Sequence, residues 1–329
     1  MALPGKVAFG FALRYGSALL IGLSSMSAQQ PVFASPPLQH EIYTAPIELI
    51  HDKPYVSVLV NGRGPYRFLI DTGTGIQAMV TPELAQELRL PVTGHARLSD
   101  PSGLGEQRSE VARIDSLNLA GAQFLELDAV VHNLYGDLNC QGVLGFPLFE
   151  DYLLTLDFPG RRMILTSGEL EADVGASVLP FRMPDGVPVI SLSIDEQPLA
   201  AQIDSGGTGL SVPEKDLNGL KFLETPVGFA NGESVSTKFQ IKAARLRSDV
   251  KLGPYTFRQP FVEINPAFPL ANFGSTPLQH FVVTFDQRES LVRFQSSGTT
   301  LHLDPSPAIM QLLNQPKRET SDANLVPIG

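Results

Sequence analysis

Two short motifs in this sequence place an acid directly before a hydroxyl residue and a glycine. The first is Asp71-Thr72-Gly73 and the second is Asp204-Ser205-Gly206. Each follows an apolar, strand-like run of residues. Two carboxyl groups brought together can activate a water molecule, because one accepts a proton from the water while the other supplies a proton to the reacting group. The chemistry that this pair suggests is therefore hydrolysis.

The protonation of such a pair follows from its electrostatics. Two carboxylates about 4 Å apart repel each other by about 4 kcal/mol at an effective dielectric constant near 20. This repulsion separates the two proton dissociations by about three pH units. A pair formed by Asp71 and Asp204 is therefore expected to hold one proton between them over a mildly acidic range, and both dissociations belong to the pair as a whole.

A single Asp-Thr-Gly or Asp-Ser-Gly is usually no more than the turn that ends a strand. Here the surroundings of the two motifs also match. The aspartates Asp71 and Asp204 are 133 residues apart, and Val143-Leu144-Gly145 lies 129 residues before Asn272-Phe273-Gly274. We interpret this shared register as an internal duplication with copies of roughly 120 residues, which is far longer than a solenoid repeat and predicts two domain-sized units.

Another pair of aspartates repeats with the same register. Asp157 and Asp286 each lie twelve residues after the glycine of the apolar motif. Both follow apolar runs and precede predicted turns. We interpret them as structural residues rather than as part of a reacting site.

Short hairpins are expected to position the two motifs. Residues 55–60 alternate as a strand, Asn61-Gly62-Arg63-Gly64 is typical of a hairpin turn, and residues 66–70 return toward Asp71. Residues 189–194 and 199–203 repeat this arrangement before Asp204. A short helix from Thr81 to about Leu90 follows in the first copy, with Thr81 as its cap and Pro82 at its first position.

A second type of hairpin is predicted after each motif. The first covers residues 94–113 with its tip near Gly103. The second has its tip at Ala230-Asn231-Gly232-Glu233, because Asn-Gly is a strong hairpin signal. These two tips, near Gly103 and Gly232, are candidates for flaps that cover a substrate.

Composition excludes several classes of function. The 29 glycines and 27 prolines, with short apolar runs between them, favour many strands and turns over long helices. A net charge of −10 without basic clusters argues against a nucleic-acid partner. The six histidines form no metal-binding motif, so no metal or other cofactor is expected. Cys140 is the single cysteine, and we interpret it as a buried thiol rather than a nucleophile.

The N-terminus has the features of an export signal. Lys6 and Arg14 supply positive charge, residues 15–23 are mostly apolar, and small residues at Ala28 and Ala34 mark two possible cleavage positions. The apolar run is short for a membrane span, and an uncleaved anchor is the alternative. Export without disulfides is typical of a bacterial envelope protein, so the expected location is the periplasm or the exterior.

At the two motifs the chain resembles the pepsin and retropepsin superfamily of aspartic proteases. In that family each lobe supplies an Asp-Thr/Ser-Gly loop, followed later by two hydrophobic residues and a glycine. The resemblance covers roughly residues 45–295, although Asn272 stands where a hydrophobic residue is expected. It implies an all-β protein with two retropepsin-like barrel lobes, few short helices and a cleft between the lobes.

The resemblance also implies roles for individual residues. Asp71 and Asp204 would be catalytic. Thr72 and Ser205 would bond across and hold the two loops in register. The glycines Gly73 and Gly206 let the backbone turn tightly beside the carboxylates. Leu144, Gly145, Phe273 and Gly274 would pack beneath the loops. A polypeptide substrate would lie extended between the lobes, and one chain supplies both aspartates, so a monomer is expected.

The predicted organisation is a signal peptide over residues 1–34, an N-terminal lobe over 35–170, a C-terminal lobe over 171–295 and a tail of unknown role over 296–329. The predicted function is an aspartic endopeptidase. Two alternatives stay open: a non-catalytic peptide-binding protein on the same scaffold, and an adaptor protein of the cell envelope.

Overall fold

The computed structural model describes residues 41–99, 106–134, 139–171, 177–233, 238–266 and 268–305. The predicted signal segment, the flap residue Gly103 and most of the predicted tail lie outside these ranges. Within them strands are the main regular structure, with two short α-helices, α1 (Pro82–Leu88) and α2 (Ser275–Leu278). The predicted all-β class is therefore confirmed. Neither helix of the described part is long and apolar enough to cross a membrane.

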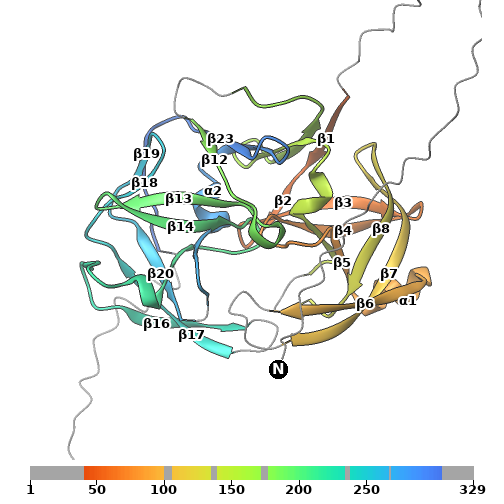
Figure 1. The fold of residues 1–329 in the computed structure, drawn as a ribbon, viewed down its shortest axis with the longest axis horizontal. Coiled ribbons are helices and arrows are strands. Elements are labelled where there is room, and N and C mark those ends of the chain that lie inside the picture. The colour runs from red at the N-terminus through yellow and green to blue at the C-terminus, as the bar shows by residue number, and fades with distance from the viewer. Residues whose placement is uncertain are drawn as a thin grey trace, which may run out of the picture. The chain divides into compact units, whose positions relative to one another are not determined.

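The first sheet contains the Asp71 motif. Its eight strands run in the order β2-β3-β4-β9-β5-β8-β7-β6, and β3 also pairs with β7, which curls the sheet (orange to yellow in Figure 1). The strands are β2 (Glu48–Ile50), β3 (Lys53–Val60), β4 (Arg63–Asp71), β5 (Ala78–Val80), β6 (Val92–Ser99), β7 (Glu106–Leu119), β8 (Ala122–Val131) and β9 (Gly142–Gly145).

The predicted hairpin before Asp71 is present as β3 and β4. Asn61 and Gly62 have positive φ angles of 49° and 73°, which is the backbone of the turn that tight hairpins prefer. Alternate residues of β3 are buried along its second half, as a strand with one face on the core requires. The central strand β9 then pairs in parallel with β4 and sets Asp71 opposite Gly145.

The second sheet has the same order of corresponding strands around the Asp204 motif. Its ten strands run β16-β17-β20-β15-β21-β14-β13-β18-β19-β24. They are β13 (Val189–Ile194), β14 (Gln197–Ile203), β15 (Leu210–Pro213), β16 (Val227–Glu233), β17 (Lys238–Arg245), β18 (Val250–Leu252), β19 (Tyr255–Phe257), β20 (Phe261–Asn265), β21 (Ala271–Phe273) and β24 (Thr300–Leu301). Here β14 pairs in parallel with β21, and Ile203 lies opposite Phe273.

A third sheet joins strands from both halves of the chain. Its order is β1-β11-β10-β22-β23-β12. The strands are β1 (Ile42–Pro46), β10 (Leu153–Asp157), β11 (Arg162–Thr166), β12 (Val178–Pro180), β22 (Val282–Asp286) and β23 (Leu291–Gln295). At its centre β10 and β22 are antiparallel, and the hydroxyl groups of Thr155 and Thr284 lie 2.9 Å apart in a hydrogen bond.

Asp157 and Asp286 end the two central strands, as predicted, and hold the following turns. The carboxylate of Asp157 accepts hydrogen bonds of 2.7 Å from both Gly160 N and Arg162 Nε. The carboxylate of Asp286 accepts from Leu170 N and Glu289 N over 2.9 and 3.1 Å. Because backbone amides and the Arg162 guanidinium occupy these oxygens, their role is structural.

Three short 3₁₀ turns complete the fold: η1 (Phe146–Phe149), η2 (Pro184–Gly186) and η3 (Glu214–Asp216). The ring of Phe146 packs edge-on against Phe285, with centroids 5.1 Å apart, and against Phe181. These contacts make the apolar core continuous between residues of the first and second halves of the chain.

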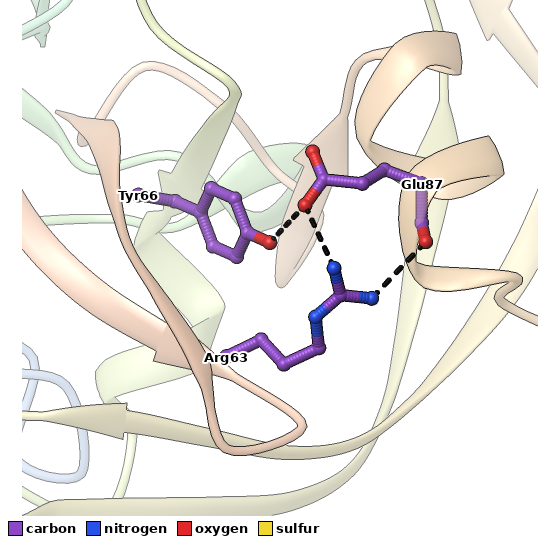
Figure 2. Close-up of polar contacts among 3 residues, drawn as sticks. All are labelled: Arg63, Tyr66 and Glu87. Carbon is purple, nitrogen blue, oxygen red and sulfur yellow. Dashed lines mark hydrogen bonds and ion pairs between the residues drawn. The ribbon is translucent and has the colours of Figure 1, made fainter.

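The helix α1 begins as the sequence predicts. Thr81 caps it by accepting a hydrogen bond from Leu84 N over 3.2 Å. Near its end Glu87 receives the Tyr66 hydroxyl over 2.6 Å and Arg63 Nη2 over 3.3 Å (Figure 2). These three side chains line a surface hollow together with Gly64 and Pro65. The hollow lies at the opposite end of β4 from Asp71.

The predicted position of the second flap turn is wrong. Asn231 and Gly232 lie within β16 and pair with Gln240 and Phe239 of β17, so they form no turn. The ladder with β17 continues past the Asn-Gly pair to Glu233. Its register shifts once, between Gly228 and Ala230. Tertiary strand pairing therefore overrides a local turn preference here. In the first copy, β6 and β7 pair as predicted on either side of residues 100–105.

Candidate active site

The structure brings the two acid motifs together through their hydroxyl residues. Thr72 N donates to Ser205 Oγ, and Ser205 N donates to Thr72 Oγ1, both over 3.0 Å. Each hydroxyl in turn donates to the other loop: Thr72 Oγ1 to the Ile203 carbonyl over 2.8 Å, and Ser205 Oγ to the Ile70 carbonyl over 2.7 Å. Both side chains are fully buried. Four hydrogen bonds therefore fix one loop against the other.

The carboxyl groups of Asp71 and Asp204 face each other across this link. Asp71 Oδ1 accepts from Gly73 N over 2.8 Å, and its Oδ2 accepts from the Thr74 hydroxyl over 2.8 Å. Asp204 Oδ1 accepts from two backbone amides, Gly206 N over 3.0 Å and Gly207 N over 2.7 Å. Amide donors of this kind favour the ionised form of a carboxyl group.

Burial and the opposing charge act in the other direction on Asp71. Burial, the charge of Asp204 and a hydrogen bond to Asp204 raise the pKa of Asp71 to about 7, against the lowering effect of Thr74 and Gly73. These effects favour the protonated form of Asp71, so the pair keeps a proton near neutral and mildly acidic pH.

Glycine is required where the loops approach the opposite carboxyl group. A Cβ atom on Gly206 would lie 2.4 Å from Cγ of Asp71, and one on Gly73 would lie 2.6 Å from Cγ of Asp204. Neither residue has an unusual φ angle, so the requirement is for space. The two glycines thus let each carboxyl group sit against the backbone of the other loop.

The apolar motifs lie beneath the loops, and Leu144 and Phe273 are fully buried. Gly145 N donates to the Gln77 carbonyl, and Gly274 N donates to the Gly209 carbonyl, both over 3.0 Å. These bonds tie each motif to the chain that follows the corresponding aspartate. Asn272, the departure from the expected pattern, places its Nδ2 next to Gly207, where a Cβ atom would be only 2.3 Å away.

Sequence reasoning missed four residues beside the pair: Lys53, Thr74, Gly207 and Glu263. Thr74 and Gly207 follow their motifs directly, so the repeated register could have indicated them. Lys53 Nζ donates a hydrogen bond to the Gly206 carbonyl, although the two residues are 153 positions apart in the chain. Glu263 accepts a hydrogen bond from the Thr208 hydroxyl. Burial raises the pKa of this glutamate to about 7, although nearby Lys53 and the bond from Thr208 lower it. No local pattern marks these last two residues.

Cys140 is buried, as predicted, and burial raises the pKa of its thiol. A raised thiol pKa disfavours the thiolate that a cysteine nucleophile needs. The flap candidate Gly232 is a strand residue of β16 and pairs with Phe239 of β17.

Comparison with known families finds a match that includes the Asp71 loop. A family model described as aspartyl protease matches residues 56–148. The matched segment belongs to the pepsin and retropepsin superfamily. This aspartyl protease segment contains Asp71, Thr72 and Gly73, together with Leu144 and Gly145, and it ends before the Asp204 motif. No curated protein matches the chain at a significant level.

Proposed function

We propose that the protein is an aspartic endopeptidase in which Asp71 and Asp204 together activate the attacking water. The observation that carries this proposal is the reciprocal bonding of Thr72 and Ser205, which sets the two carboxyl groups face to face. The family match supports a protease-type function, and it covers one of the two aspartates. The second aspartate, Asp204, is included because the bonds between Thr72 and Ser205 bring its loop against the Asp71 loop.

The local environment of each carboxyl group suggests its role at the start of the reaction. Asp204 accepts two amide hydrogen bonds and would be the carboxylate that takes a proton from water as the water oxygen attacks the peptide carbonyl. Asp71, with its raised pKa, would donate its proton to the carbonyl oxygen. The tetrahedral intermediate would then collapse: the proton on Asp204 passes to the leaving nitrogen, the C–N bond breaks, and a hydroxyl proton returns to Asp71.

The substrate that fits this proposal is an extended polypeptide, whose backbone groups can pair with strand edges. The chemistry uses only the two carboxyl groups and water, so the proposal needs no cofactor. We further propose that the two sheets descend from an internal duplication, which is supported by their common strand order and by the matched bonds around residues 72 and 205.

The direct test is cleavage of an unfolded protein by purified protein beginning at Ser35, from mildly acidic to neutral pH. Asp71→Asn and Asp204→Asn should each lower kcat/KM by about 10²–10⁴-fold, which is the typical contribution of general acid–base catalysis per group. Asp157→Asn is the matched control, and it should retain the wild-type cleavage rate in correctly folded protein.

Cleavage that persists in both dyad variants would refute the proposed mechanism. Wild-type protein that binds peptide but cleaves nothing at any pH would instead support the peptide-binding alternative.

Export is a separate proposal, supported by the charge and apolar pattern of residues 1–34. The mass of protein recovered from the cell envelope is the test. Cleavage after Ala28 or Ala34 is expected, whereas an intact N-terminus on membrane-bound protein would indicate an anchor.

A further inference from the structure

A lysine from the first sheet contacts the loop that holds the second aspartate. Lys53 opens β3 and donates from Nζ to the carbonyl oxygen of Gly206. The side chain is half-buried, and so is Gly206. A charged donor to a backbone carbonyl in such a site makes a stronger hydrogen bond than a neutral donor.

The accepting peptide unit also serves Asp204. The Gly206 carbonyl and the Gly207 N–H belong to the same peptide bond, and Gly207 N donates to Asp204 Oδ1 over 2.7 Å. Hydrogen bonds in a chain polarise one another. A positive charge on the carbonyl side therefore strengthens the N–H as a donor and stabilises negative charge on the carboxylate.

The pair of loops is asymmetric in this respect. In the repeated register Pro54 corresponds to Pro188, so the position of Lys53 is taken by Val187 in the second half. Valine carries neither a charge nor a side-chain donor. Instead of a lysine, the backbone carbonyl of Asp185 approaches the first loop, where a Cβ atom on Gly75 would lie only 1.9 Å from it.

We propose that Lys53 is a positioning residue that keeps the negative charge of the half-protonated pair on Asp204, acting through the Gly206–Gly207 peptide unit. This inference rests on the proposed function. It goes beyond that function by assigning the different roles of the two aspartates to a residue outside both motifs.

Other charged or titratable groups adjoin the Asp204 loop and Lys53, and the test has to separate them. They are Asp71 across the pair, Glu263 on β20, Asp52 in the turn before β3 and the Cys140 thiol near Lys53. Asn272 and Gln202 also face the loops, but they are neutral. Glu263 is the most important competitor, because Lys53 acts on its charge as well.

The experiment is the pH dependence of kcat/KM for wild type, Lys53→Met and Lys53→Arg. Loss of the charge should move the acid limb upward by roughly 0.5–1 pH unit, as expected for a charge that acts through one peptide unit. The basic limb should move less, because the Gly207 N–H donates to Asp204 and not to Asp71. Lys53→Arg should restore the acid limb, and Lys251→Met, on the exposed side of β18, is the matched control.

Two results would overturn the proposal. One is a Lys53→Met variant whose rate falls by the same factor at every pH, which would indicate a purely structural role. The other is a shift that disappears in a Glu263→Gln background, which would assign the response to Glu263.

If wild-type protein cleaves nothing, the proposed function fails, and stability then tests Lys53 by itself. The melting temperature difference between wild type and Lys53→Met should be larger near pH 7 than near pH 3, because the charge on Lys53 stabilises the Asp204 loop only while the pair carries negative charge. In an Asp204→Asn background this pH dependence should disappear. A difference that is equal at all pH values in both backgrounds would contradict the inference.

Discussion

Thr72 and Ser205 are hydrogen-bonded to each other twice, each through its backbone N–H and the hydroxyl oxygen of the other. Each hydroxyl also donates to the carbonyl of the residue that precedes the opposite aspartate. The hydroxyl groups are thus used as donor and acceptor at once. This explains why a hydroxyl residue follows the aspartate in both motifs, since no apolar side chain could make either bond.

Ser205→Ala should destabilise the protein by about 2–4 kcal/mol, because it leaves Thr72 N and the Ile70 carbonyl buried without a partner. Ser205→Thr keeps the hydroxyl and should cost less. The measurement is the free energy of unfolding from denaturant titration. Ser191→Ala, at an exposed position of β13, should change it by less than about 0.5 kcal/mol. Equal effects of Ser205→Ala and Ser191→Ala would show that the link carries little energy.

The raised pKa of Asp71 predicts how stability depends on pH. The folded protein binds a proton at Asp71 up to about pH 7, whereas the unfolded chain releases it near pH 4. The contribution of this proton to stability is therefore complete below about pH 4 and is lost as the pH rises through about 7.

Asparagine at this position cannot ionise. The free energy of unfolding of Asp71→Asn, relative to that of wild type, should therefore rise by roughly 3–4 kcal/mol between pH 4 and pH 7. Denaturant titrations at several pH values measure this difference. A difference that stays constant over that range would contradict the assignment of the proton to Asp71.

Gly206→Ala should lower kcat/KM by at least about 10-fold and destabilise the protein by about 1–3 kcal/mol. The added methyl group would lie 2.4 Å from Cγ of Asp71, so the carboxyl group has to move. Gly94→Ala is the matched control, because nothing lies within 4 Å of its added Cβ atom. Steady-state kinetics and thermal melting of both variants make the comparison. Equal activity of the two would argue against a close approach of Gly206 and Asp71.

Glu87→Ala tests the surface hollow beside α1. The variant loses the bonds from Arg63, which is exposed, and from Tyr66, which is half-buried but contacts Glu87 at the surface (Figure 2). Exposed contacts of this kind contribute about 0–1 kcal/mol, so a small loss of stability is expected. The value of kcat/KM should not change, because the hollow lies at the far end of β4 from Asp71. A 10-fold loss of activity would instead connect the hollow with the substrate.

Local sequence patterns determined a large part of this structure. The Asn61-Gly62 turn, the hairpins before both aspartates and the Thr81 cap of α1 all follow from residues close together in the chain. These features could be predicted because turn geometry and strand alternation depend on short-range sterics and hydrogen bonds. The all-β class and the pairing of each acid with a hydroxyl residue and a glycine belong to the same group.

Tertiary structure decided the features that depend on distant residues. The second hairpin passes through Asn231-Gly232 without turning, because its pairing with β17 outweighs the local preference. Lys53 and Glu263 reach the Asp204 loop from β3 and β20, and no spacing in the sequence indicates either contact. The sequence thus determined which groups could react. The packing of the sheets decided which charges surround them, because electrostatic effects depend on distance in space and on burial, not on position along the chain.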